Sequence, residues 1–199
     1  MKVLMLLAHP DDEVICGWPI LQNKSIEKEI LICSSDINNP ERKWCSHRKK
    51  VLFELCDNLK IKCRCLDYNS AFYKVNAREN KLKELGEDIL KNISSFSFDY
   101  IFTHNPWGEY GMMDHILLNN IAMHSGYSLI ISDMFIPSNW SYFNNISTNF
   151  RLFLKNLFIE SFLNKDFYNK CKKYYTENKV WTWNKEPLKK CNLYTIDVI

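Results

Sequence analysis

His9-Pro10-Asp11-Asp12-Glu13 is the first group of side chains in this chain that could do chemistry. It directly follows the apolar residues 3–8, which are typical of a buried strand. A strand that ends in a short turn before a helix places such side chains at the carboxyl edge of a sheet, where open α/β folds bind ligands. Because neighbouring residues in a turn point in different directions, one aspartate can bind a cation while the other acts as a base. Capping of a helix N-terminus would explain the acidic residues but not the histidine.

A second group of polar side chains follows another apolar segment, residues 98–103. Two glycines and a proline in residues 104–115 predict a loop, and the helical spacing of residues 113–123 puts His115 in the first turn of a helix. One histidine and one carboxylate from the first loop can then meet one histidine from the second. This set suits Zn²⁺ or another divalent metal, with a position left open for water.

Strands and helices alternate along the chain, which predicts a parallel sheet with right-handed crossovers. Strands are expected at residues 2–8, 29–34, 61–66, 98–103 and 128–134, and helices at residues 12–22, 41–59, 78–93 and 113–123. A strand order of 3-2-1-4-5 would bring the loops after strands one and four together. The expected fold class is α/β: a Rossmann-like three-layer sandwich with a mostly parallel sheet, as a single domain over residues 1–199, with the active site at the carboxyl ends of strands one and four.

Composition, net charge and cysteine spacing argue against nucleic-acid binding, membrane spans and a disulfide-rich fold. The 199 residues are 46% hydrophobic, enough for a sizeable core, and the net charge of +3 is too small to indicate nucleic-acid binding. No apolar stretch approaches the ~20 residues of a membrane span. The eight cysteines contain no CxxC pair, and Cys33, Cys63 and Cys65 fall in predicted strands, so we expect free thiols and a cytoplasmic location. The oligomeric state is left open.

Both motifs resemble those of the PIG-L/LmbE-like metal-dependent de-N-acetylases, whose signatures are AHPDDE after strand one and a GEYGHxxH-like motif later. The first is complete in residues 8–13, and the resemblance covers both motifs and the order of elements over roughly the first two thirds of the chain. It implies that His9, Asp12 and His115 bind the metal, that Asp11 is the general base, and that Tyr110 polarises an amide carbonyl. The substrate implied is a small-molecule N-acetylated sugar, such as an N-acetylglucosamine derivative, or its conjugate.

One position departs from that family pattern. Met112 stands where the family has a histidine that assists collapse of the tetrahedral intermediate, and a thioether cannot donate a proton. Another group could supply the acid, Asp11 could carry out both proton transfers, or the chain could be slow or have changed its chemistry. His104 is the best-placed other imidazole, although it could equally hydrogen-bond within its own loop. His47 and His124 are expected to be ordinary helix residues.

Three further residues are expected to contact the substrate. Trp107 could stack on a sugar ring or simply pack in the core. Arg48 could bind a phosphate, carboxylate or hydroxyl of the substrate, or lie on a helix surface. Asn105 lies in the same loop as Trp107 and is expected to contact the substrate there. In the last third, residues 149–173 show helical spacing, and residues 179–183 and 193–199 are typical of extended segments that could cover the sheet or rim the pocket.

Two other function classes are compatible with the sequence. The first is a degenerate family member that binds a metal and a glycan or sugar nucleotide without turnover; retention of Asp11 argues against it. The second is a plain doubly wound nucleotide-binding or interaction module in which residues 9–13 only cap a helix. The absence of GxGxxG after strand one argues against dinucleotide binding.

Overall fold

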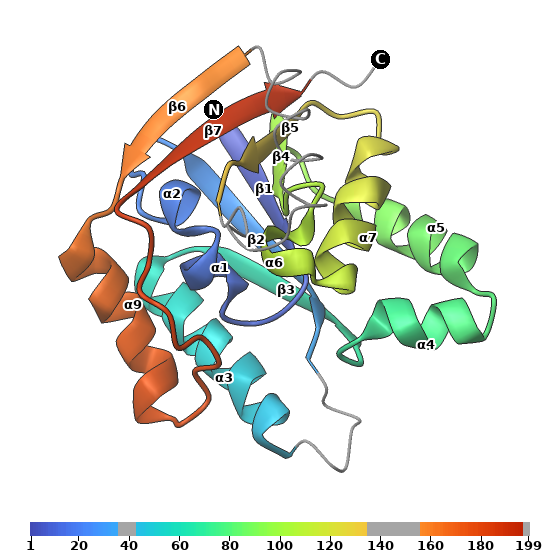
Figure 1. Ribbon diagram of the computed structural model, residues 1–199, viewed down its shortest axis with the longest axis horizontal. Helices are drawn as coiled ribbons and strands as arrows, with labels where there is room; N and C mark the ends of the chain where they lie inside the picture. The colour runs from blue at the N-terminus through green and yellow to red at the C-terminus, as the bar shows by residue number, and fades with distance from the viewer. Residues whose placement is uncertain (36–42, 135–155, 197–199) are drawn as a thin grey trace.

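The computed structural model describes residues 1–35, 43–134 and 156–196. Its centre is a seven-stranded sheet in the order β3-β2-β1-β4-β5-β7-β6 (Figure 1). The strands are β1 (Lys2–Leu7), β2 (Glu27–Ser34), β3 (Lys62–Tyr68), β4 (Tyr100–Thr103), β5 (Leu129–Ser132), β6 (Asn156–Phe162) and β7 (Lys190–Ile196). The first five pair in parallel in the predicted order, whereas β7 and β6 extend the sheet in antiparallel fashion. The α/β fold class with a mostly parallel sheet is therefore confirmed.

Helices cover both faces of the sheet (Figure 1). They are α1 (Asp12–Ile15), α2 (Trp18–Leu21), α3 (Lys43–Leu59), α4 (Phe72–Arg78), α5 (Leu82–Ile93), α6 (Gly108–Gly111), α7 (Met113–Met123) and α9 (Lys165–Glu177). Because successive side chains of a strand point to opposite faces, β1 contributes to two cores. Val3, Met5 and Leu7 pack on the side of α1, α2, α3 and α9. Leu4 and Leu6 pack on the side of α5 and α7.

The pairing of β1 with β4 positions the two motifs. Val3 lies opposite Tyr100 and Leu6 opposite Thr103 in parallel register, so both strands end at the same edge of the sheet. The loop after β1 and the loop after β4 consequently lie side by side. This is the change of direction in strand order at which open α/β sheets bind ligands.

Two predicted helices are interrupted. Residues 12–22 form α1 and α2 rather than one helix, and Gly17 lies between them. Gly17 packs so closely on α1 that a Cβ atom would lie 2.8 Å from the Glu13 carbonyl oxygen. Pro19 then lies in the first turn of α2, where its missing N–H costs little. Residues 78–93 were predicted as one helix, but α4 ends at Arg78 and α5 begins at Leu82. Between them, Asn80 has a φ of 56°, which no helix continues through.

The C-terminal third departs most from the prediction. Residues 156–162, expected to be helical, form β6 and pair with β7, whereas residues 149–155 and 197–199 lie outside the described residues. The helix α9 begins only after Asn164, whose side chain caps it by accepting from the Phe167 N–H at 3.0 Å. Residues 179–183 are irregular rather than a strand, and β7 occupies the second expected extended segment.

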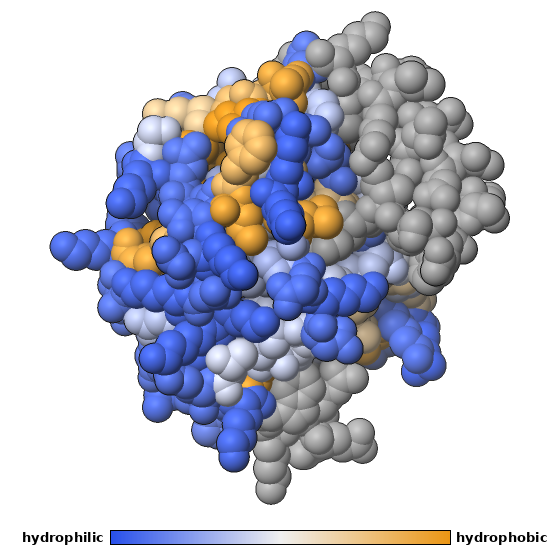
Figure 2. All heavy atoms as spheres, turned by 60° about the vertical axis from the view of Figure 1, so that its left-hand side comes forward, coloured by the Kyte–Doolittle hydropathy of each residue, from blue (hydrophilic) through white to orange (hydrophobic). Residues whose placement is uncertain are grey.

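The side of the molecule with α9 and β6 is turned forward in Figure 2. Hydrophilic residues cover most of it, and hydrophobic residues gather in a band toward its upper part. The edge strand β6 exposes Leu157 and Phe162. Within the described ranges, no helix has the length and hydropathy needed to cross a bilayer.

Candidate metal centre

The loop after β1 turns the two aspartates in different directions. Asp11 has a φ of 93°, a left-handed conformation that is unusual for a residue other than glycine. Its backbone N–H donates to Glu13 Oε2 at 3.0 Å, and its carbonyl oxygen accepts from the Ile15 N–H at 2.9 Å. Asp12 begins α1 and points back across the loop, where its Oδ2 accepts from the His9 N–H at 2.7 Å. The divergence expected from the sequence is thus present.

The loop after β4 is held by Glu109 and Asn105. The Glu109 N–H donates to Asn105 Oδ1 at 2.7 Å, and the Asn105 N–H donates to Glu109 Oε1 at 3.1 Å. Glu109 has a φ of 56°, so each motif contains one strained backbone position. The loop leads into α7, and His115 in its first turn faces the β1 loop.

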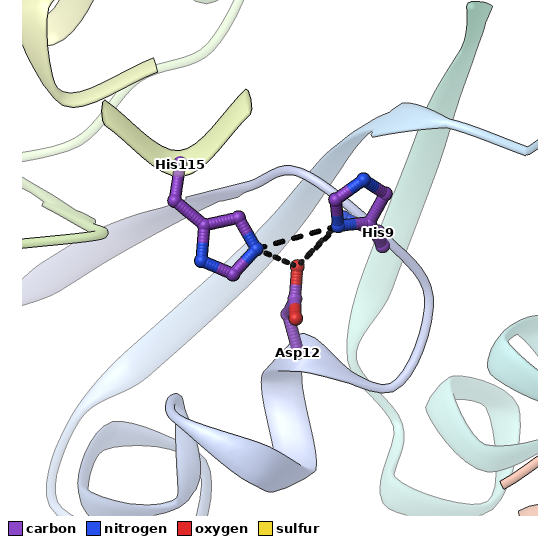
Figure 3. A group of neighbouring side chains, drawn as sticks. All are labelled: His9, Asp12 and His115. Atoms are coloured by element: carbon purple, nitrogen blue, oxygen red, sulfur yellow. Dashed lines mark hydrogen bonds and ion pairs between the residues drawn. The ribbon is translucent and has the colours of Figure 1, made fainter. Parts of the chain in front are cut away.

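His9, Asp12 and His115 point toward one another from three elements (Figure 3). His9 Nδ1 lies 3.3 Å from Asp12 Oδ2, and His115 Nε2 lies 3.4 Å from that oxygen. The two nitrogens are 3.3 Å apart. Tetrahedral coordination with metal–ligand bonds of about 2.0–2.1 Å separates donor atoms by about 3.3–3.4 Å. The triangle of donor atoms therefore has the dimensions of three corners of a zinc tetrahedron.

Carboxylates outside the triangle fix which nitrogen of each histidine faces it. His115 Nδ1 donates to Glu109 Oε2 at 2.7 Å, which leaves the Nε2 lone pair for the triangle. His9 Nε2 donates to Asp114 Oδ2 at 3.1 Å, which leaves Nδ1. Asp114 is itself held by the Tyr73 N–H at 2.9 Å. Such carboxylate–histidine pairs orient metal-binding histidines and raise their basicity.

The charge of the site also favours a cation. Five carboxylates are buried among the described residues, against one buried arginine or lysine side chain: Asp11, Asp12, Glu13, Glu109 and Asp114 against Arg48. Burial alone would lower the pKa of His115, but the charge and hydrogen bond of Asp12, with help from Glu109, raise it to about 10. Burial would raise the pKa of Asp12, but the charge of His115 holds it well below its ordinary value. Positive charge is therefore stabilised on the face that these side chains share.

A second group of buried side chains, Cys16, His104 and Glu109, lies next to the triangle. The His104 ring stacks on His115 with 3.6 Å between centroids. Its Nε2 accepts from the Ala8 N–H at 3.0 Å, so Nδ1 carries the proton and faces Glu109 Oε2 at 3.0 Å. Both nitrogens are therefore engaged within the protein.

A pocket of about 550 Å³ opens beside the triangle: His9 and Asp12 line it, whereas His115 is fully buried and does not. It is lined by His9, Asp12 and Asp114 and by Asp11, Arg48, Tyr110, Met112 and Thr182, among others. The Asp11 carboxylate lies between two donors: Arg48 Nη2 contacts Oδ1, and Thr182 Oγ1 donates to Oδ2 at 2.6 Å. Burial raises the pKa of Asp11, with Arg48 opposing. Tyr110 stands edge-on to His115 with 5.6 Å between ring centroids.

The predicted substrate contacts are divided between the pocket and the core. Arg48 is buried and lines the pocket, and its guanidinium also contacts the Pro10 carbonyl oxygen. Trp107 is only 1% exposed and donates from Nε1 to the Met134 carbonyl oxygen, so the structure favours packing over stacking on a sugar. Asn105 is fully buried and organises its own loop, and His104 likewise has no face on the pocket. For these three residues the prediction of direct action on substrate is not supported.

Three residues of the site were missed by the sequence reasoning. Glu109, which orients His115, lies within the second motif, six residues before that predicted ligand. Asp114, which orients His9, directly precedes the predicted ligand His115, so its position in the motif was a usable signal. Thr182 is 171 residues from its partner Asp11, and no local pattern indicates that contact.

Comparison with known proteins identifies the family. Residues 4–125 match the family model PIG-L, described as GlcNAc-PI de-N-acetylase. A relative, the uncharacterized protein L374 of Acanthamoeba polyphaga mimivirus, is 26% identical over 132 residues, which are 59% of this chain and 55% of that protein. This chain thus spans about half the length of that relative.

Solved structures share the fold. The A40926 pseudoaglycone deacetylase Dbv21 matches with a TM-score of 0.65 and 13% identity, covering 99% of this chain and 98% of that one. The zinc-inhibited form of the teicoplanin deacetylase Orf2 matches with a TM-score of 0.62 and 12% identity, covering 98% and 97%. The family match extends over more than half of the chain and contains both motifs that build the triangle. This chain therefore belongs to the PIG-L family.

Proposed function

We propose that this protein is a metal-dependent hydrolase that removes the acetyl group from an N-acetylated sugar of the N-acetylglucosamine type, or from its conjugate. Membership of a family described as de-N-acetylases supports the reaction class. The observation that carries the proposal is the donor triangle of His9, Asp12 and His115, which has zinc dimensions and opens on a pocket that also contains Asp11. We propose these three side chains as the metal ligands, with Zn²⁺ or another divalent cation as the cofactor.

Each side chain at the triangle has a distinct task. A divalent cation held by His9, Asp12 and His115 would supply Lewis acidity, which lowers the pKa of a bound water and polarises a carbonyl. Glu109 and Asp114 hold His115 and His9 with their lone pairs inward. Asp11 lines the same pocket as His9 and Asp12 and is held by Arg48 and Thr182, and it takes the proton of the attacking water. Burial raises the pKa of Asp11, and the charge of Arg48 opposes that rise.

The pocket walls bind the substrate. Tyr110 lies beside His115 and keeps its phenol protonated, because burial and nearby carboxylates raise its pKa well above the ordinary value. It can therefore donate a hydrogen bond to the acetamide oxygen as negative charge develops there. Arg48 holds Asp11 and offers the pocket a positive charge for a substrate hydroxyl or anionic group.

The leaving amine must be protonated, and Met112 cannot do so. Met112 is 36% exposed and lines the pocket, so the position expected for the family histidine does face the substrate space. His104 is enclosed and has both ring nitrogens engaged. We therefore propose that Asp11 performs both proton transfers, receiving the proton from water and returning it to the amine.

The same Met112 supports a second candidate function. A protein that binds a metal and a glycan or sugar nucleotide without turnover would keep the triangle and the pocket and would not need an acid at this position. The retention of Asp11 between two donors favours the hydrolase.

Metal analysis and acetate release test the proposal together. The protein should carry about one divalent metal per chain and release acetate from at least one member of a panel of N-acetylated sugars and conjugates. Zinc should be titrated from below to above one equivalent and compared with other divalent ions, because a protein of the same fold is known in a zinc-inhibited form. Asp11→Asn should retain the metal and lose turnover. Metal binding without acetate release from any member would favour the second candidate, and failure to bind any divalent metal would refute both.

A further inference from the structure

The chain between α9 and β7 returns to the pocket. Residues 180–184 have no regular structure and run back past α1 toward the sheet (Figure 1). They lie outside residues 4–125, the part that matches the family. Thr182 nevertheless lines the pocket together with Asp11, Arg48 and Tyr110.

Two consecutive residues of this segment touch the two groups to which we assign proton transfer and carbonyl polarisation. Thr182 Oγ1 donates to Asp11 Oδ2 at 2.6 Å. The Trp183 ring packs on Tyr110 with 5.1 Å between centroids. From the preceding helix, Tyr175 donates its hydroxyl to Glu13 Oε1 at 2.5 Å, and Glu13 Oε2 accepts from the Asp11 N–H. The C-terminal region thus holds both the backbone and the carboxylate of Asp11.

The hydrogen bond from Thr182 differs in kind from the contact with Arg48. Arg48 brings a full positive charge to Oδ1, which stabilises the ionised carboxylate and weakens it as a base. Thr182 is neutral, so it orients Oδ2 with a smaller loss of basicity. With one oxygen held by each donor, the carboxylate cannot rotate freely, and the remaining lone pairs keep a fixed direction relative to His9, Asp12 and His115. A base must lie within about 2.6–3.2 Å of the proton that it abstracts, so this direction matters for catalysis.

We propose that Thr182 is a positioning residue for amide hydrolysis at this site: its hydroxyl holds the Asp11 carboxylate in the orientation that accepts the proton of water. The inference rests on the proposed function and extends the active site to a segment beyond the family match. It assigns the effect of Thr182 to turnover rather than to substrate or metal binding.

Thr182→Val and Thr182→Ser test it. Valine keeps the shape and removes the hydroxyl, and serine keeps the hydroxyl. Thr182→Val should lower kcat about 10- to 100-fold, the size expected for loss of one hydrogen bond to a charged group, with KM and metal content changed less than about threefold. Thr182→Ser should recover most of the lost kcat. Thr176→Val is the matched control, because the Thr176 hydroxyl donates to the Lys173 carbonyl oxygen on the exposed side of α9; it should leave kcat unchanged.

The outcomes distinguish this inference from the proposed function. Acetate release by Thr182→Val at the wild-type kcat, or equal loss in the serine and valine variants, would overturn the positioning role and leave the hydrolase standing. A parallel loss of metal from Thr182→Val would also overturn it, since Thr182 would then support the ligands. Absence of acetate release from the metal-loaded wild-type protein would overturn the proposed function, and the positioning role with it.

Discussion

The triangle of His9, Asp12 and His115 and the adjacent cluster of Cys16, His104 and Glu109 contain similar side chains but differ in what those side chains can still bind. In the triangle, each histidine gives one nitrogen to an outer carboxylate and keeps the other for the shared face. In the cluster, His104 Nε2 accepts from the Ala8 N–H, and His104 Nδ1 donates to Glu109 Oε2, so neither nitrogen is left for a ligand. Two side chains of the triangle, His9 and Asp12, line the pocket, whereas no side chain of the cluster does.

Residue type and proximity alone do not distinguish the proposed metal site from the cluster, because both groups have them. A set of metal ligands needs lone pairs that are not already used in hydrogen bonds within the protein. It also needs hydrogen-bond acceptors behind the ligands, which orient each histidine so that its free nitrogen faces the metal. Asp114 accepts from His9, and Glu109 accepts from His115. Because Glu109 Oε2 also accepts from His104, the cluster supports the triangle.

The largest effect should come from removing a ligand. Asp12→Ala or His115→Ala should abolish tight metal binding and lower turnover by about 10³-fold or more, since Lewis acidity contributes several kcal/mol and each tenfold in rate is ~1.4 kcal/mol. Metal content after dialysis and acetate release measure both effects. Asp11→Asn is the control and should keep its metal. Equal metal loss in all three variants would show that the roles of the two aspartates are not separable.

The next largest effect should be an increase in kcat from Met112→His. Met112 lies in the pocket, so Met112→His should place an imidazole where the leaving amine needs a proton and raise kcat by up to about 10²-fold, the low end of general acid effects. KM should change little. Met113→His is a suitable control, because Met113 is exposed to a similar degree and lines the same pocket one residue away.

A different result is expected if His104, rather than Asp11, protonates the leaving amine. If it supplied the proton, Met112→His would change little and His104→Asn would reduce kcat and alter the alkaline limb of the pH profile. We expect His104→Asn to lower the melting temperature, because the Ala8 N–H loses a buried acceptor, and to leave that limb in place.

The support role of the cluster predicts an intermediate effect. Glu109→Gln should weaken metal affinity about 10- to 100-fold, the usual size for loss of a carboxylate behind a metal-binding histidine. Glutamine keeps the shape but cannot accept from His104, His115 and the Asn105 N–H in the same way. A competitive chelator titration measures the affinity, with Glu84→Gln on the exposed start of α5 as the control. Unchanged affinity would mean that Glu109 supports only the loop.

The parts of the fold that were predictable have local causes. The apolar runs of β1, β2 and β4 are buried on both faces, so they stand out in the sequence, and their alternation with helices predicted the parallel pairing. The donor triangle followed from two motifs at the ends of β1 and β4. The pairing of these strands then brought the motifs together.

The parts that were missed depend on distant contacts. The strand β6 is defined by its pairing with β7, about thirty residues on, and its mixture of apolar and polar residues also fits a helix face. An indole ring can stack on a sugar, so residue type alone made Trp107 a candidate for substrate binding. In the structure Trp107 is buried and its Nε1 donates to the Met134 carbonyl oxygen, so its ring does not face the pocket. The contact between Thr182 and Asp11 joins the loop after β1 to a segment that follows α9, and α9 itself contacts α3 and α1.

The smallest effect should come from Cys16, and it is the strictest test of the comparison. Its Sγ lies 4.0 Å from both Asp12 Oδ1 and His104 Nδ1, too far for more than a weak interaction. Cys16→Ala should leave metal affinity within about twofold of the wild-type value and lower the free energy of unfolding by about 1 kcal/mol, the cost of a small buried cavity. Cys171→Ala in α9 is the matched control, since Cys171 is also fully buried but lies away from the site, and it should show a similar loss in chemical denaturation. A tenfold fall in metal affinity for Cys16→Ala alone would mean that the cluster reaches the metal directly, because a merely structural thiol would affect both variants alike.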